Sequence, residues 1–194
     1  MKKTLIALVA VLVSLSTYGQ GSVFFSTRDT AAGIDAKVVR AAGTVGAGLG
    51  AGGTVGPAIT AQLFLVGAGG SLTPLTPATT FRTTGSAANH FYINATDVVV
   101  PGIAAGQSAT FRFRAYETAA GSYDAAANST TFQFGESNDV TVSALGGTPV
   151  GGGAPITTPT LVGLQGFTLT IVPEPGTIAL GVLGGLALLA RRRK

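Results

Sequence analysis

The sequence predicts an all-β protein, an antiparallel β-sandwich of about seven to nine short strands. We expect an N-terminal signal helix and a C-terminal transmembrane helix to flank it. Three observations lead to this fold class. Several stretches of the 194-residue chain alternate apolar and polar residues with a period of two, as half-buried strands do. Links rich in glycine, proline, serine and asparagine separate them. The central region shows no convincing 3.6-residue apolar period of the kind that amphipathic helices have.

The N-terminal residues have the three parts of an export signal. Met1-Lys2-Lys3 is cationic, residues 4–13 are apolar, and residues 14–19 are small and polar. We expect signal peptidase to cut after Gly19 or Gln20, so that residues 1–19 form a signal peptide. The alternative is an uncleaved anchor helix. The apolar run is short for that role, because a membrane-spanning helix takes about 20 residues.

Residues 20–172 are expected to form the β-domain. Its candidate strands are 22–27, 58–66, 91–94, 97–100, 109–117, 130–134, 139–143 and 166–172. The range 58–66 carries apolar residues on both faces near its end, which indicates a central strand. In 109–117 three residues are predicted to point inward and three toward solvent: Phe111, Phe113 and Ala115 against Arg112, Arg114 and Tyr116.

The links between the strands are expected to be loops. Residues 43–56 are glycine-dominated and uncharged, which is typical of a flexible loop, although an elastic or self-associating segment is the alternative. Pro101-Gly102 is expected to end the strand before it. Residues 119–127 are alanine-bearing but contain Gly121, which favours a loop. Residues 146–159 are expected to be a loose connection that lets the last strand cross the sandwich.

The C-terminal residues have three parts in a fixed order. Pro173-Glu174-Pro175-Gly176 is a break that a helix does not cross easily, residues 177–190 are apolar on every face, and Arg191-Arg192-Arg193-Lys194 is a cationic stop. Cations that flank a membrane span stay on the cytoplasmic side, so the β-domain is expected outside the inner membrane. The apolar run is short for a lasting anchor. We therefore expect a transient transmembrane helix over 177–190.

This C-terminal region resembles the PEP-CTERM sorting signal. The resemblance implies an exported protein of a Gram-negative bacterium whose tail is recognised and removed by a membrane-embedded exosortase. It further implies association with extracellular polysaccharide or biofilm. The expected partners are therefore signal peptidase, an exosortase-type enzyme, the inner membrane before processing and extracellular polysaccharide. The expected location is the cell surface or the extracellular space.

The charge distribution argues against a nucleic-acid partner. The formal net charge of the chain is +4, but six cations and seven acids leave residues 20–172 near neutrality. The excess cations lie in the two terminal segments, whereas nucleic-acid binding requires a basic face on the folded domain. The chain also has no cysteine, which excludes disulfides, thiol chemistry and cysteine-ligated zinc.

Residues 20–172 contain no motif that predicts an enzyme or a cofactor. His90 is the single histidine and is expected in a loop or at a strand edge. Asp124, Glu136 and Asp139 are the nearest candidates for a hydrolase pair or for a calcium turn with Asn128, but no calcium-loop motif is present. We therefore expect a non-enzymatic structural component without cofactor or metal.

Two alternatives to the structural role remain open. A carbohydrate-binding or adhesive module would use Arg112, Arg114 and Tyr116 to contact acidic polysaccharide. A secreted hydrolase would use the acids named above. The hydrolase would need a pocket with convergent acids, and the absence of a cleft near Asp124, Glu136 or His90 would remove this alternative.

Overall fold

The computed structural model describes residues 19–40, 58–83 and 90–172, and the protein is mostly β in these ranges. Their strands are β1 (Gln20–Phe25), β2 (Arg28–Asp29), β3 (Ile34–Asp35), β4 (Val38–Arg40), β5 (Ile59–Val66), β6 (Leu72–Pro74), β7 (Thr79–Thr80), β8 (Thr96–Ala104), β9 (Ala109–Glu117), β10 (Phe134–Val142) and β11 (Phe167–Leu169). Their short helices are η1 (Ala68–Gly70), η3 (Thr118–Ala120) and α2 (Tyr123–Ala127).

The largest sheet has five antiparallel strands. Its order is β10-β9-β5-β6, and β7 also pairs with β5. The prediction of an all-β protein with antiparallel pairing is therefore confirmed. The strand predicted over 58–66 is β5, and its central position is confirmed because β9 pairs on one side of it and β6 and β7 on the other.

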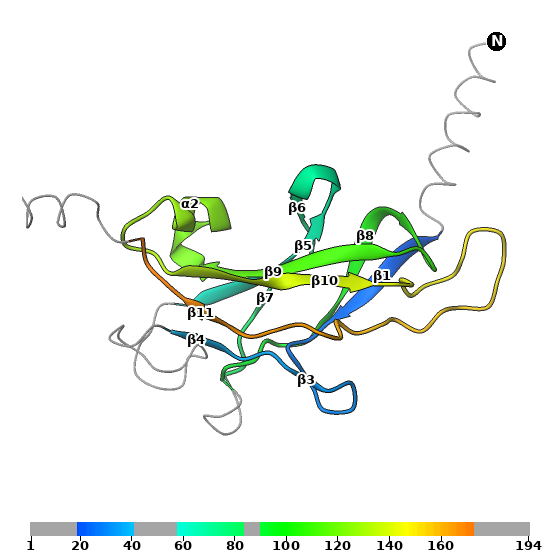
Figure 1. The fold of residues 1–194 in the computed structure, drawn as a ribbon, viewed down its shortest axis with the longest axis horizontal. Coiled ribbons are helices and arrows are strands. Elements are labelled where there is room, and N and C mark those ends of the chain that lie inside the picture. Colours follow the sequence, from blue (N-terminus) through cyan, green and yellow to red (C-terminus); the bar gives the residue numbers. More distant parts are fainter. Residues whose placement is uncertain (1–18, 41–57, 84–89, 173–194) are drawn as a thin grey trace, which may run out of the picture.

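Three two-stranded pairs lie beside this sheet: β1 with β8, β2 with β3, and β4 with β11. Figure 1 shows β3, β4 and β11 on one side of β9 and β10, and α2 and β6 on the other side. The β4–β11 pair is parallel and joins segments that lie far apart in the sequence. The expectation that the last strand crosses over is consistent with this pairing, since β10 belongs to the large sheet and β11 does not.

The main hydrophobic core lies between the large sheet and these pairs. The inward face of β9 contributes Phe111, Phe113 and Ala115, all of them buried as predicted. The ring of Phe113 makes edge-to-face contacts with Phe25 of β1, 5.2 Å away, and with Phe167 of β11, 5.0 Å away. Aromatic pairs at this separation stabilise a core beyond the area that they bury.

A second, smaller core covers the opposite face of the sheet, and it overturns two predictions. Tyr116 was expected in solvent but is only 7% exposed, because it packs with Phe64, Tyr123 and Ala126 beneath α2. The expected loop 119–127 contains α2, whose N-cap Ser122 accepts a hydrogen bond from the backbone of Ala125. The alternation along β9 places Tyr116 on the outer face of the sheet. It cannot indicate that α2, which follows β9 in the chain, packs over this face and buries Tyr116.

Other predicted strand boundaries were wrong. The strand predicted to end at Pro101-Gly102 runs on as β8 to Ala104, with an irregular register where Gln20 faces Ala104 but Gly21 faces Val100. A bulge of this kind accommodates a proline and a glycine with φ of 78° within a strand that pairs on one side. Residues 91–94 contribute an isolated bridge, and of 130–134 only the last residue belongs to a strand.

Several predicted features lie outside the described residues: most of the signal peptide, the glycine-rich segment 43–56, and the entire range 173–194. In the ranges that the structure describes, no helix has the length and apolar character needed to cross a membrane.

The parallel pair β4–β11 depends on a close backbone approach at Gly166. A Cβ atom on Gly166 would lie 2.1 Å from the carbonyl oxygen of Lys37 and 2.7 Å from its nitrogen. The next residue, Phe167, donates its backbone N–H to the same carbonyl at 3.1 Å. Glycine at 166 therefore lets the two strands meet, since any side chain would push the backbones apart.

We predict that Gly166→Ala lowers the free energy of unfolding by about 1–3 kcal/mol, because the added carbon overpacks a rigid backbone contact. The matched control is Gly153→Ala, whose Cβ would come no closer than 3.5 Å to Pro149. Its effect should stay within about 0.5 kcal/mol. Urea unfolding of both variants tests the comparison. Equal stability of the two would contradict the close approach described here.

Candidate functional site

The predicted signal-cleavage residues lie where the folded part of the chain begins. The carbonyl of Gly19 accepts a hydrogen bond from the backbone N–H of Ala105 at 2.8 Å, and Gln20 is the first residue of β1. A cut after Gly19 would leave all of β1 in the mature chain. The other predicted processing residues, Pro173-Glu174-Pro175-Gly176 and Arg191-Arg192-Arg193-Lys194, lie outside the described residues.

The richest group of polar side chains in the described ranges lies on the outer face of β9 and β10. Antiparallel register places Arg112 opposite Asp139 and Arg114 opposite Glu136. Arg112 donates to both carboxylate oxygens of Asp139, at 2.6 and 3.0 Å, and its Nη1 donates to Glu136 at 3.3 Å. Two parallel N–H···O bonds fix the guanidinium plane relative to the carboxylate.

Arg114 is held by one hydrogen bond and by contacts with two aromatic rings. Its Nε donates to Glu136 at 2.9 Å, and its guanidinium carbon lies 3.9 Å from the ring centre of Tyr123 and 5.1 Å from that of Phe64. Its Nη1 lies 3.8 Å from the carboxylate of Asp124. Stacking on aromatic rings is a contact that a guanidinium makes well, and it leaves the N–H groups at the edge of the plane free to bond. The guanidinium group is thus held in one orientation, with Nη1 toward α2.

These contacts shift several pKa values. The hydrogen bond from Arg112, followed by its charge, lowers the pKa of Asp139, although some burial opposes this. The hydrogen bond to Asp139 likewise raises the pKa of Arg112. Burial, followed by the negative charge of Glu136, raises the pKa of Tyr123 to about 12. Tyr123 therefore stays a neutral phenol at physiological pH, and its hydroxyl donates to Glu136 at 3.4 Å.

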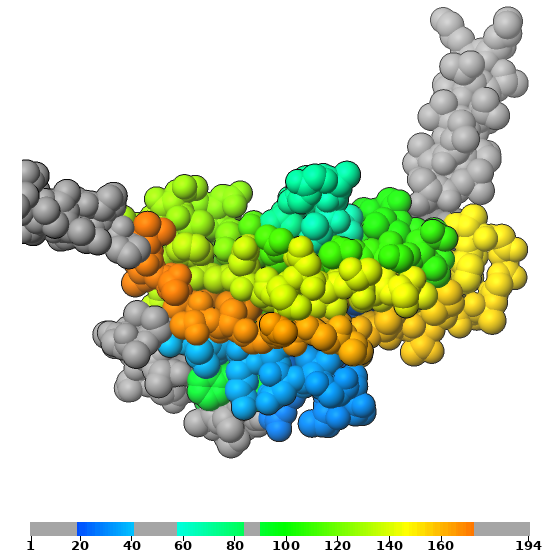
Figure 2. Space-filling view, in the orientation of Figure 1, coloured from blue at the N-terminus to red at the C-terminus, as the bar shows by residue number. Residues whose placement is uncertain are grey.

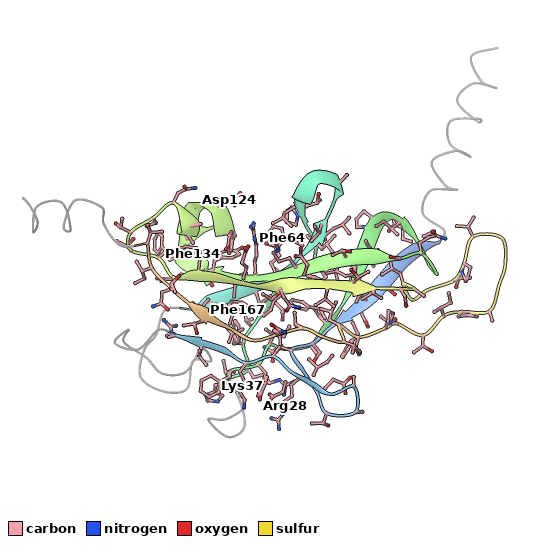
Figure 3. The ribbon with its side chains drawn as sticks, viewed as in Figure 1. Arg28, Lys37, Phe64, Asp124, Phe134 and Phe167 are labelled. Atoms are coloured by element: carbon pink, nitrogen blue, oxygen red, sulfur yellow. The ribbon has the colours of Figure 1, made fainter. Side chains whose placement is uncertain are left out.

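A hollow of about 380 Å³ opens beside this cluster, and we call it the β6–α2 hollow. It is lined by Gln62, Phe64, Gly70, Leu72, Pro74, Arg114, Ser122, Tyr123 and Asp124. Figure 2 shows the two lobes that border it, one formed by the β5–β6 turn and the other by the segment around α2. Figure 3 places Asp124 and Phe64 on this side of the sheet, and Phe167 on the other.

A second hollow, of about 600 Å³, lies near β2 and β3 on the opposite side of the molecule. Its charged groups satisfy one another. The guanidinium of Arg28 lies 5.0 Å from the ring centre of Tyr92, the Tyr92 hydroxyl donates to Asp35, and Lys37 lies 3.4 Å from the same carboxylate. The hydrogen bond from Tyr92 lowers the pKa of Asp35, and the charge of Asp35 raises that of Lys37. No sequence motif pointed to this group.

The acids predicted as candidates for a hydrolase pair or a calcium turn serve as partners of arginines in the folded protein. Asp124 and Glu136 do converge, but on Arg114, and Asp139 is taken by Arg112. Within the described ranges, no three acidic or histidine side chains are grouped so that they could hold a metal ion. His90 lies in a turn and lines neither hollow.

The residues proposed to contact acidic polysaccharide do not form an open basic face. Arg112 and Arg114 are paired with acids of the same sheet, and Tyr116 is buried. Three residues around this cluster belong to no site that the sequence predicts: Gln62, Phe64 and Tyr123. The aromatic residues could not have been assigned to Arg114 from the sequence, because β5 and α2 are brought to it only by the fold.

The described residues form a mostly β protein with polar clusters on the outer face of β9 and β10 and near β2 and β3. Residues 172–194 match the family model of the PEP-CTERM protein-sorting motif. The chain therefore carries a sorting signal that implies export and processing by an exosortase. Comparison of the chain with curated proteins and with solved structures returned no match.

We predict a pH-dependent contribution from Asp139 to stability. Because its pKa is lowered in the folded protein, its contribution is fully present above the unfolded value of about 3.9 and is lost as pH falls through the folded value. Asp139→Asn should therefore cost up to about 1 kcal/mol at neutral pH, and the cost should shrink progressively as pH falls below about 3.9. Urea unfolding across this pH range measures it.

The control for this prediction is Asp97→Asn, which changes an exposed acid of β8 that forms no ion pair with the described residues. It should change stability little at any pH. A cost for Asp139→Asn that is the same at pH 7 and at pH 2–3 would contradict the ion pair as its source.

Proposed function

We propose that this protein is a non-enzymatic structural component delivered to the cell surface or extracellular matrix, where it associates with extracellular polysaccharide or biofilm. The observation that carries the proposal is the match of residues 172–194 to the PEP-CTERM protein-sorting motif. This motif accounts for delivery, and the small β-domain ahead of it is the cargo.

The charges at the two ends support the same route. Met1-Lys2-Lys3 precedes an apolar run in the manner of a signal peptide. Arg191-Arg192-Arg193-Lys194 follows a second apolar run, and flanking cations favour the cytoplasmic side of a membrane. Both ends thus favour a β-domain outside the inner membrane, a transient anchor over 177–190 and a C-terminus in the cytoplasm before processing.

The polar cluster supports a role without catalysis. The carboxylates of Glu136 and Asp139 accept hydrogen bonds from Arg112 and Arg114, so these acids act as partners of fixed cations. A general acid or base must reach a substrate proton with its own polar atoms. Ion pairs across two strands instead favour a rigid surface.

We predict that replacing Pro173, Glu174 and Pro175 by alanine blocks removal of the tail, so that the chain without its signal peptide stays in the membrane fraction. Fractionation and intact mass of the protein from the bacterium that produces it measure this. The wild-type protein should instead lack both terminal segments and leave the membrane.

Pro155→Ala provides the matched control, since Pro155 lies in the exposed connection between β10 and β11. It should be processed like the wild type. A triple variant that is processed normally would contradict the sorting role of these residues. A reporter fused after Lys194 that is active only outside the cytoplasm before processing would contradict the proposed orientation.

A further inference from the structure

We propose that the β6–α2 hollow is a binding site for a neutral sugar unit of a glycan. This proposal names the class of polymer that the protein would bind. It rests on the proposed function in one respect, namely that the protein reaches a place where glycans are present. The hollow offers a hydrogen-bond donor, an acceptor, cations and acids side by side, and room for a small ligand.

Arg114 supplies the hydrogen-bond donors. A guanidinium has five N–H groups in a fixed plane. Of these five N–H groups in Arg114, only Nε–H donates a hydrogen bond to a described residue, and that residue is Glu136. Nη1 lies 3.8 Å from Asp124, which is too far for a direct hydrogen bond. The ring of Tyr123 and the bond to Glu136 hold the group in place, so a ligand need not pay to order it.

Asp124 supplies the acceptor. Its side chain is 88% exposed, and its carboxylate accepts no hydrogen bond from the residues that the structure describes. A guanidinium and a carboxylate side by side at the edge of a hollow present donors next to acceptors. Neighbouring hydroxyl groups of a sugar match such a pair, because each hydroxyl both donates and accepts.

Other lining residues fit the same class of ligand. The amide of Gln62 donates to the carbonyl of Leu75 at 3.1 Å, which fixes its orientation beside the hollow. Leu72 and Pro74 provide apolar wall opposite α2. Pockets that bind small molecules combine an apolar lining with a few fixed polar groups, as this one does. The volume of about 380 Å³ is at the lower end of such pockets and suits a short stretch of glycan.

The local charge selects against charged ligands. The cluster contains two cations, Arg112 and Arg114, and three acids, Asp124, Glu136 and Asp139. An acidic sugar or a phosphate would face the exposed carboxylate of Asp124. A metal ion would need three free ligands, and none of the described acidic groups offers that arrangement. Uncharged hydroxyls avoid both costs.

The test measures sugar binding to the full-length chain in a detergent that carries no sugar headgroup. The probes are neutral disaccharides of glucose, galactose and mannose, with disaccharides of glucuronate and galacturonate as the charged comparison. Saturation-transfer NMR detects contact, and calorimetry gives the Kd. At least one neutral disaccharide should bind, and more tightly than either acidic one.

Asp124→Asn keeps the shape of the side chain and removes its charge. Because the variant loses a charged acceptor, which forms stronger hydrogen bonds than a neutral one, neutral binding should weaken by about tenfold or more. The preference against the acidic disaccharides should shrink at the same time, which a merely structural role for Asp124 would not cause. Since Asp124 is largely exposed, the variant is expected to fold.

The matched control is Asp97→Asn on β8, which should leave binding unchanged. Three results would overturn the proposal: no neutral disaccharide binds, an acidic one binds more tightly, or Asp97→Asn weakens binding as much as Asp124→Asn. None of these results would contradict the proposed sorting of the protein, because sorting is tested separately by the variant at residues 173–175. Failure of that test would in turn leave sugar binding intact.

Discussion

The position of Phe113 in the middle of β9 is the contact on which the two layers of this protein depend. Its ring meets Phe25 of β1 on one side and Phe167 of β11 on another, so three strands from distant parts of the sequence share one aromatic group. The chain has no cysteine to cross-link them. Burial of apolar surface must therefore hold the layers together, and large aromatic side chains bury the most per residue.

The same strand builds the polar cluster on its other face. Because successive side chains of β9 point to opposite sides, burying Phe111 and Phe113 places Arg112 and Arg114 together on the outer face. Register with β10 then supplies Asp139 and Glu136 as partners. Because the core fixes the backbone of β9, it also fixes the positions of Arg112 and Arg114. The guanidinium of Arg114 therefore borders the β6–α2 hollow in one orientation.

Features that depend on neighbouring residues in the chain could be predicted from the sequence, whereas contacts between distant segments could not. Alternation identified β5 and β9, the central position of β5 and the inward face of β9, because a strand's burial is reflected in the spacing of its own apolar residues. It failed at Tyr116, where α2 covers the outer face, and at Pro101, where a bulge lets the strand continue. The sequence predicted Asp124 as a hydrolase or calcium candidate and Arg114 as a contact for polysaccharide. It did not place the two side by side, because no local pattern connects α2 to β9.

The sequence by itself determined that the protein carries a sorting signal and that its fold is mostly β. Sorting signals act as contiguous segments, so the motif at 172–194 is complete in the primary structure. The tertiary structure alone decided which charges are paired, that Tyr116 is buried, and that Gln62, Arg114 and Asp124 border one hollow. The reason is physical: these contacts join β5, β9 and α2, and their distances are set by strand register and helix docking, which no local pattern specifies.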